Sequence, residues 1–175
     1  LMQRFDLKVD AVFWARIVDS TKQGWHGGEA GLARMRRLLA KPYDCYFFLG
    51  IPPRNLPSEM LYKVLKPVSE GAGIVLAGTD DRRILKPQRQ VRPLPEFIRG
   101  VRGAMAFEVK NGRGVRLPGR PRLDYYVGWQ TAYEYWQEGL GRALLWAAGR
   151  EPKASLTAAV AKPTSTGKIS LVLLF

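Results

Sequence analysis

The apolar positions in the first half of the chain follow the period of a helix in two places and that of a strand between them. Residues 29–41 and 57–68 carry apolar side chains every three to four positions, which predicts two amphipathic helices. Runs rich in β-branched and aromatic residues predict strands, the first of them as one long strand or a tight strand pair. These strands are expected at residues 6–18, 43–49, 73–77 and 83–89. The order strand, helix, strand, helix, strand, strand predicts an α/β protein with a mixed β-sheet flanked by helices.

The second half of the chain is less regular, and we expect residues 90–175 to pack on the core formed by residues 1–89. Its clearest period predicts a helix over residues 126–140 with a stripe of large side chains. The stripe consists of Trp129, Tyr133, Trp136 and Leu140. Helical spacing favours burial of this stripe in the core, with base stacking as the alternative. The other elements expected are a helical turn at 95–102, a strand at 104–110, a basic surface loop at 111–122, a strand or helix at 142–148 and a hairpin of 155–162 with 168–175.

Composition places the chain among ordinary globular proteins. Hydrophobic residues make up 46% of the chain and charged residues 25%, which argues for a packed core. The longest uncharged apolar stretch, residues 169–175, is far shorter than the roughly 20 residues that span a bilayer. A single cysteine, Cys45, excludes an internal disulfide, and the first residues lack the apolar run of a secretory signal. These features predict a cytoplasmic protein without a membrane span.

Basic residues are concentrated in one segment. The chain has 28 lysines and arginines against 15 acidic residues, and residues 82–122 alone hold 12 basic and 2 acidic side chains. Arginine dominates there, and its planar guanidinium binds phosphate through two parallel hydrogen bonds. A solvated surface and an acidic protein partner are the alternatives, but the excess of one sign favours DNA or RNA. The arginines expected to bind nucleic acid are Arg82, Arg83, Arg89, Arg92, Arg99, Arg102, Arg113, Arg116, Arg120 and Arg122.

One short motif indicates chemistry. In the run Glu108-Val109-Lys110, the two-residue period of a strand places Glu108 and Lys110 on the same face. A carboxylate beside an amine can serve a nuclease, because the carboxylate binds a divalent cation and the amine stabilises charge in the transition state. Asp80 or Asp81 would supply a second carboxylate, and Gln130 an amide from the following helix. The alternative is an ordinary ion pair on a sheet.

The combination of Asp81, Glu108-Val109-Lys110 and Gln130, with tyrosines nearby, resembles the PD-(D/E)XK nuclease superfamily, in particular its RecB-like branch. The resemblance implies a restriction-endonuclease-like core and cleavage of DNA phosphodiesters. It also implies Mg or Mn bound by Asp81 and Glu108, Lys110 as the catalytic lysine and Gln130 in contact with the site. The tyrosines lie three and five residues after Gln130, whereas the RecB-like pattern has one at the fourth position.

A second alignment with the same superfamily uses the first half of the chain. Asp6 or Asp10 would then take the first acidic position, and Ala15-Arg16-Ile17 would replace the second motif without any carboxylate or lysine. This version implies a degenerate nuclease fold that only binds. Two functions therefore stay open, a metal-dependent nuclease and a non-catalytic nucleic-acid-binding or structural subunit of a larger complex. The choice between DNA and RNA, and the presence of protein partners or a second copy, stay open as well.

Overall fold

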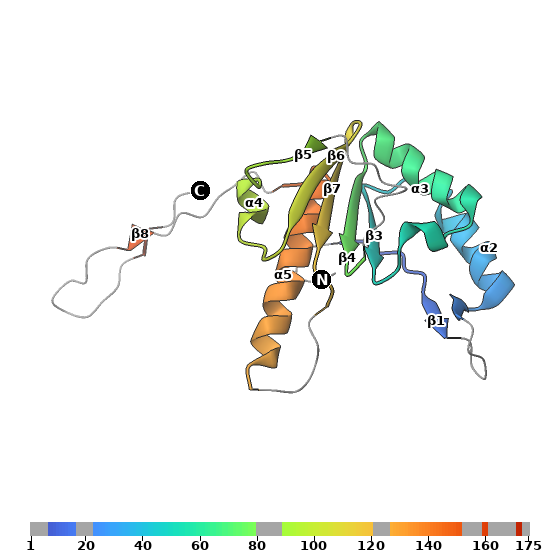
Figure 1. Cartoon of the computed structure of the whole chain (residues 1–175), viewed down its shortest axis with the longest axis horizontal. Helices are drawn as coiled ribbons and strands as arrows, with labels where there is room; N and C mark the ends of the chain where they lie inside the picture. The colour runs from blue at the N-terminus through green and yellow to red at the C-terminus, as the bar shows by residue number, and fades with distance from the viewer. Residues whose placement is uncertain are drawn as a thin grey trace.

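The structure is a computed structural model, and it describes residues 7–16, 23–79, 89–120, 127–151, 159–160 and 171–172. A five-stranded sheet lies at its centre, with helices on both faces (Figure 1). The helices are α2 (Gly28–Leu38), α3 (Ser58–Glu70), α4 (Glu96–Arg99) and α5 (Trp129–Ala147), with a 3-10 turn at Pro53–Asn55. The strands are β1 (Trp14–Arg16), β2 (Gln23–Trp25), β3 (Cys45–Leu49), β4 (Gly73–Ala77), β5 (Arg89–Gln90), β6 (Met105–Val109), β7 (Gly112–Leu117), β8 (Ala159–Val160) and β9 (Leu171–Val172).

The central sheet has the strand order β3-β4-β7-β6-β5. β3, β4 and β7 run parallel, whereas β6 and β5 are each antiparallel to their neighbours. The three parallel strands end at Leu49, Ala77 and Leu117, and we call this side of the sheet the carboxyl edge. β6 begins at the same edge, because its first residue, Met105, lies opposite Arg116 near the end of β7.

The predicted fold class is confirmed at the level of an α/β protein with a mixed sheet between helices. Strands from both predicted parts of the chain build this sheet, since β3 and β4 precede residue 90 and β6 and β7 follow it. β4 lies in the interior of the sheet and is buried on both faces. Its side chains Ile74 and Leu76 point to one face and Val75 and Ala77 to the other, and all four have 0% exposure. This explains why β4 is a continuous apolar run rather than an alternating one.

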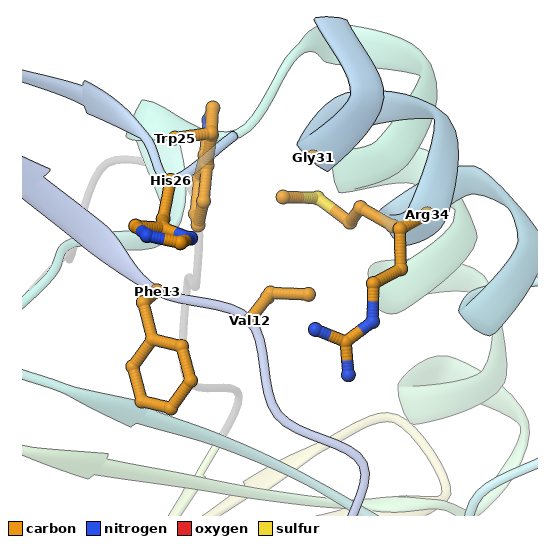
Figure 2. A pocket seen from close by; sticks show the side chains of 7 residues that line it. Val12, Phe13, Trp25, His26, Gly31 and Arg34 are labelled. Atoms are coloured by element: carbon orange, nitrogen blue, oxygen red, sulfur yellow. The ribbon is translucent and has the colours of Figure 1, made fainter. Parts of the chain in front are cut away.

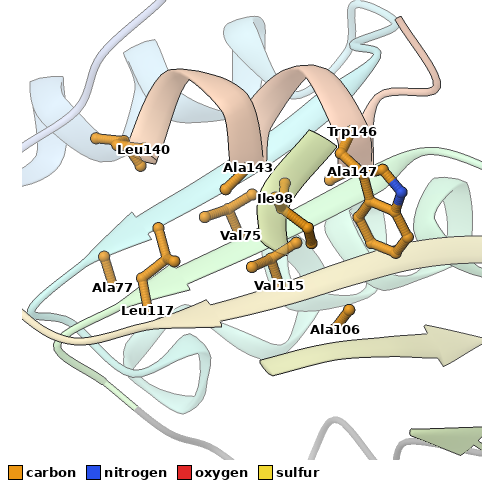
Figure 3. Close-up of a cluster of buried hydrophobic side chains, with 10 residues drawn as sticks. All are labelled: Val75, Ala77, Ile98, Ala106, Val115, Leu117, Leu140, Ala143, Trp146 and Ala147. Carbon is orange, nitrogen blue, oxygen red and sulfur yellow. The ribbon is translucent and has the colours of Figure 1, made fainter. Parts of the chain in front are cut away.

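Each face of the sheet carries its own hydrophobic core. On one face, Ile74, Leu76 and Phe107 pack against α2 and α3, with Met60 and Val64 at the centre of that layer. On the other face, α4 and α5 cover the strands (Figure 3). The buried side chains there are Val75, Ala77, Ile98, Ala106, Val115, Leu117, Leu140, Ala143, Trp146 and Ala147. The result is a three-layer arrangement with the sheet in the middle.

Two glycines allow the helices to approach the sheet closely. A Cβ at Gly112, on β7, would lie 2.0 Å from the carbonyl oxygen of Val68 on α3. A Cβ at Gly73, on β4, would lie 2.5 Å from the backbone of Ala147 on α5. Real Cβ atoms do not make contacts this short, so only glycine fits at either position. The close packing of both helix layers therefore depends on the missing side chains.

The prediction of a basic loop over residues 111–122 is wrong for its first half, because Gly112–Leu117 forms β7 between β4 and β6. Three features that suggested a loop have structural roles instead. Gly112 faces α3, Gly114 leaves room for the ring of Phe107, and Val115 and Leu117 are buried under α5. The arginines between them also belong to a strand, and their side chains therefore alternate between the two faces of the sheet.

The predictions for the helices are largely confirmed, with one extension. Helices form at Gly28–Leu38, Ser58–Glu70 and Glu96–Arg99, and a single helix, α5, covers Trp129–Ala147. The helix does not end at Leu140 as expected. Gly139, within this longer helix, is buried because it lies against Val101, whose Cγ1 would be 3.0 Å from an added Cβ. Burial on α5 is concentrated from Gly139 onward, so the expected burial of the stripe is confirmed only in part. Leu140 is buried and Trp136 packs against the core while staying partly exposed, whereas the expected burial of Trp129 and Tyr133 is wrong because both are partly exposed.

The remaining expectations have mixed outcomes. The first apolar run forms a short strand that pairs with residues 23–25, Trp14 lying opposite Trp25, rather than a strand pair within residues 6–18. β3 is an edge strand, and its Phe47 and Leu49 side chains are exposed. The C-terminal hairpin is confirmed for the described pairs of β8 and β9, whereas residues 83–88 lie outside the described residues. In the ranges given above, no helix combines the length and the apolar character needed to cross a membrane.

Candidate nucleic-acid interface

The arginines expected to bind nucleic acid lie in three separate places. Seven of the ten belong to the described part of the chain, whereas Arg82, Arg83 and Arg122 lie outside it. Arg89 lies on the edge strand β5 and Arg92 just after it. Arg113 and Arg116 lie on β7. Arg99, Arg102 and Arg120 lie beside the carboxyl edge.

Arg113 is held by the C-terminal end of α5. Its guanidinium lies over the ring of Trp146, with Cζ 5.3 Å from the ring centroid, and donates to the carbonyl oxygen of Trp146 at 3.4 Å. It also forms an ion pair with Glu151, with 2.7 Å between Nη1 and Oε1. Together these contacts satisfy the positive charge and fix the planar group against the protein. Arg113 is therefore a structural residue that joins β7 to the end of α5.

Arg116 points to the opposite face of the sheet. Its guanidinium carbon lies 4.7 Å from the centroid of the Phe107 ring, a cation–π geometry, and the side chain is half buried. Gly114, which lies directly opposite Phe107 in the antiparallel pair, leaves the space that the ring occupies. Arg116 thus packs on its own sheet, and we do not include it in the candidate interface.

Arg89 and Arg92 lie along the outer side of the sheet. Arg89 is on β5, a strand of two residues at the end of the strand order, and lies opposite Glu108 of β6. Both arginines are exposed. Short, charged edge strands are a common means of preventing edge-to-edge association of sheets. The charge and edge position of Arg89, with Arg92 just after the strand, therefore have an explanation that needs no ligand.

Arg99, Arg102 and Arg120 remain, and the fold brings them to the carboxyl edge from two loops. Arg99 ends α4 and Arg102 lies in the loop that leads into β6, whereas Arg120 follows the end of β7. The two loops touch, because a Cβ at Gly103 would lie 3.0 Å from Cγ of Pro118. The antiparallel pairing of β6 with β7 is what places the start of one strand beside the end of the other.

These three arginines are available to a ligand. All three side chains are exposed, and none has an ion pair or hydrogen bond to another described residue. Of the two acidic residues in segment 82–122, Glu96 lies three residues before Arg99, whereas Glu108 lies near the far end of β6. We call Arg99, Arg102 and Arg120 the edge arginines. Their exposure and lack of protein partners distinguish them from Arg113 and Arg116.

The geometry of the Glu108-Val109-Lys110 motif differs from the prediction. Glu108 lies on β6, but the strand ends at Val109, and Lys110 belongs to the tight turn to β7 with a φ of 52°. The prediction that Glu108 and Lys110 share a strand face is therefore wrong. Glu108 is half buried and lies opposite Arg113 on one side and Arg89 on the other.

Gln130 lies at the opposite end of α5 from this motif. Arg113 is the cross-strand partner of Glu108, and its guanidinium contacts Trp146 near the end of α5. Trp146 therefore marks the end of α5 that lies near Glu108. Gln130 precedes Trp146 by 16 residues on the same helix, a distance of about 24 Å at the rise of an α-helix. The structure therefore does not bring Gln130 to Glu108, although both were expected at one site.

Of the two metal ligands expected, Asp81 and Glu108, only Glu108 belongs to the described residues. Two arginines flank Glu108 in the sheet register, which suits a carboxylate that balances positive charge. Within the part of the chain that the structure describes, no three His, Cys, Asp or Glu side chains lie close enough together to hold a metal ion. The pairing of Asp81 with Glu108 at one metal site therefore stays a prediction.

A small hollow lies between the N-terminal segment and α2, away from the carboxyl edge (Figure 2). Its lining includes Phe13, Trp25, His26 and Arg34, a combination of aromatic and basic groups that would suit a nucleotide. Its volume, about 20 Å³, is enough for a single water molecule. The hollow is thus too small for a base, and we do not include it in the interface.

Sequence reasoning missed how the edge arginines come together and which aromatic residue of α5 is most exposed. The contact between residues 100–104 and the end of β7 depends on strand pairing, which no local pattern reveals. A signal for Tyr135 does exist, since it falls off the stripe of Trp129, Tyr133 and Trp136, and the structure leaves it 72% exposed. Comparison of the chain with protein-family models, with curated proteins and with solved structures finds no match.

Proposed function

We propose that this protein binds nucleic acid through the edge arginines, Arg99, Arg102 and Arg120, as a binding protein to which we assign no cleavage step. The observation that carries the proposal is that two loops distant in sequence place three exposed arginines without protein partners along one edge of the sheet. Ligands of open α/β sheets bind outside the carboxyl ends of parallel strands, which is where these arginines lie. The net charge of +13 supports a polyanionic partner.

The chemistry of the edge arginines suits a phosphate backbone. A guanidinium binds two phosphate oxygens at once, and it does so most strongly when no carboxylate competes for it. Phosphate contacts give affinity without reading sequence, because they do not touch base edges. We therefore expect binding with little sequence preference. The sugar type is an outcome of the experiment below, since DNA and RNA carry the same phosphate.

The nuclease interpretation requires Glu108, Lys110 and Gln130 close together at one site. Lys110 is in a turn rather than beside Glu108 on the strand, and Gln130 lies about 24 Å away along α5. A restriction-endonuclease-like core, with Mg or Mn at Asp81 and Glu108, stays a prediction from the resemblance. The non-catalytic alternative needs only the exposed arginines, and it is the one that we propose.

The test compares two variants with the same change of net charge. The first replaces Arg99, Arg102 and Arg120 by alanine, and the control replaces Arg34, Arg36 and Arg37, which belong to α2 on the other side of the sheet. Fluorescence anisotropy with labelled DNA and RNA, each with and without Mg²⁺, should show weaker binding of the first variant by about tenfold or more and intact oligonucleotides throughout. Equal weakening by both variants would mean that net charge alone attracts the ligand, and the interface would be wrong.

A further inference from the structure

The N-terminal half of α5 extends beyond the sheet. Leu140 packs with Ala77 and Leu117 at the ends of β4 and β7 (Figure 3), and the buried residues of the helix begin at Gly139. Residues 129–138 therefore lie toward and past the carboxyl edge, a length of about 15 Å, and within them Trp136 still packs against the core. Figure 1 shows this part of the orange helix projecting below the strands.

The projecting half is rich in aromatic rings. Tyr133 and Trp136 stack on each other, with centroids 6.1 Å apart and planes inclined by 22°. Tyr135 is 72% exposed and Val127, just before the helix, is fully exposed. A flat, partly exposed stack of two rings offers an outer face on which a third flat ring can lie. Such faces are used by proteins that bind single strands, because every base presents a π-face.

Tyr135 shares a side of α5 with Gly139, four residues later, and this side contacts the loop of the edge arginines. Val101 packs against Gly139 of α5, so the loop that carries Arg102 lies at the point where the helix leaves the sheet. Arg120 follows β7 at the same edge, next to the same loop. On the helix itself, the carboxylate of Glu138 is paired with Arg142, and Glu134 is the exposed carboxylate between the two tyrosines. Positive charge and exposed rings are therefore found together, which is the combination that unpaired nucleic acid requires.

We propose that the ligand is single-stranded nucleic acid, with its phosphates on the edge arginines and its bases stacked on Tyr133 and Tyr135. This inference rests on the proposed function and specifies the class of ligand. A duplex offers its phosphates but keeps its bases stacked inside, so it would gain nothing from the tyrosines. A second copy of this chain would also cover apolar rings, but the adjacent exposed arginines would then face one another and repel, which disfavours that occupant.

The experiment measures the affinity of the full chain for a labelled single strand of about 12 nucleotides, within the usual site size, and for a duplex of the same length. Tyr135→Ala should weaken single-strand binding by about fivefold to a hundredfold, because each stacked base contributes that much affinity, and the double variant Tyr133→Ala/Tyr135→Ala should weaken it further. Duplex binding should change by less than about twofold if the tyrosines contact bases only. Tyr135→Phe, which keeps the ring, should restore single-strand affinity. Tyr62→Ala is the matched control, since Tyr62 is 64% exposed on α3.

Each result supports or overturns one specific statement. Unchanged single-strand affinity in Tyr135→Ala, or tighter binding of duplex by the wild type, would overturn the inference while the arginine interface stands. No binding of either oligonucleotide by the wild type would overturn the proposed function itself. Sedimentation of the same variants completes the test: a wild-type dimer that Tyr135→Ala converts to monomer, with nucleic-acid affinity unchanged, would assign the aromatic surface to a second copy and overturn the inference. Because Tyr135 is largely exposed, its removal should leave the circular dichroism spectrum unchanged.

Discussion

The guanidinium of Arg116 lies over the ring of Phe107, with 4.7 Å between Cζ and the ring centroid. The two residues belong to neighbouring antiparallel strands, and Gly114 leaves the space in which the ring lies. This contact converts an arginine of a strongly basic segment into a structural residue. It also shows that the number of basic residues in a segment overestimates the charge available to a ligand.

We therefore expect Arg116→Ala to affect stability rather than binding. Loss of a partly desolvated cation–π contact should lower the free energy of unfolding by about 1–2 kcal/mol. Urea unfolding measures this loss, and the affinity of the folded protein for nucleic acid should stay the same. A tenfold loss of affinity with unchanged stability would mean that Arg116 leaves Phe107 to contact phosphate.

The edge arginines should control the salt dependence of binding. If each of the three neutralises one phosphate, replacing all three by alanine should reduce the slope of log K against log salt by about 2 to 3. For the wild type, three such contacts alone correspond to a loss of about 40-fold in affinity between roughly 50 and 200 mM salt. Titrations at several salt concentrations measure both slopes. A triple variant with the wild-type slope would place the phosphate contacts elsewhere.

Gly112 should be intolerant of substitution. An added Cβ would lie 2.0 Å from the carbonyl oxygen of Val68 and 2.6 Å from that of Ala72, and backbone atoms cannot move away as a flexible side chain can. We expect Gly112→Ala to destabilise the protein by about 2–3 kcal/mol or to prevent folding, as overpacking does. Gly100→Ala is the control, because a Cβ added there would have no atom within 4 Å and the φ of Gly100 is −78°. Equal stability of the two variants would refute the close approach of α3 to β7.

The thiol of Cys45 should react slowly in the folded protein. Burial raises the pKa of this thiol to about 12, and the nearby Asp44 adds to the effect. The folded pKa exceeds that of the unfolded chain, so the folded thiol stays protonated near pH 9, where the unfolded thiol already forms thiolate. Its contribution to stability is present below the unfolded pKa and is lost as the pH rises toward 12. Labelling with a thiol reagent at about pH 8.5, near the pKa of a free thiol, should therefore follow unfolding by urea. Because Cys45 is only partly buried, fast labelling without urea would contradict its raised pKa rather than its place in the fold.

The sequence was a good guide where local pattern and tertiary environment agree. Gly73–Ala77 was predicted with its observed bounds, because a short apolar run between glycines describes a strand buried on both faces. Gly112–Leu117 was missed because its glycines and arginines are typical of a loop. In the structure, the glycines leave room for the carbonyl oxygen of Val68 and the ring of Phe107, and Arg113 contacts α5. None of these partners lies nearby in the sequence.

The candidate site shows the same limit. The excess of arginine identified the segment 82–122, but the separation of structural from available arginines depends on strand alternation along β7. Arg113 and Arg116 point to opposite faces of the sheet and both find aromatic partners. The gathering of Arg102 and Arg120 depends on the pairing of β6 with β7. Pairing and side-chain partners are long-range properties, so the charge pattern alone could give only the class of ligand.

Two tryptophans of α5 should respond differently to replacement by phenylalanine. Trp136, in the projecting half, is partly exposed, and among the described residues its buried Nε1–H has no hydrogen-bond partner. Trp136→Phe removes that donor, and the gain should offset the lost contact area, so we expect a change of less than about 1 kcal/mol in the free energy of unfolding. Trp146 is 5% exposed and supports Arg113 through its ring, so Trp146→Phe should cost about 1–3 kcal/mol. Urea unfolding of both variants tests the difference, and a larger cost at Trp136 would mean that the projecting half of α5 is packed as tightly as the half over the sheet.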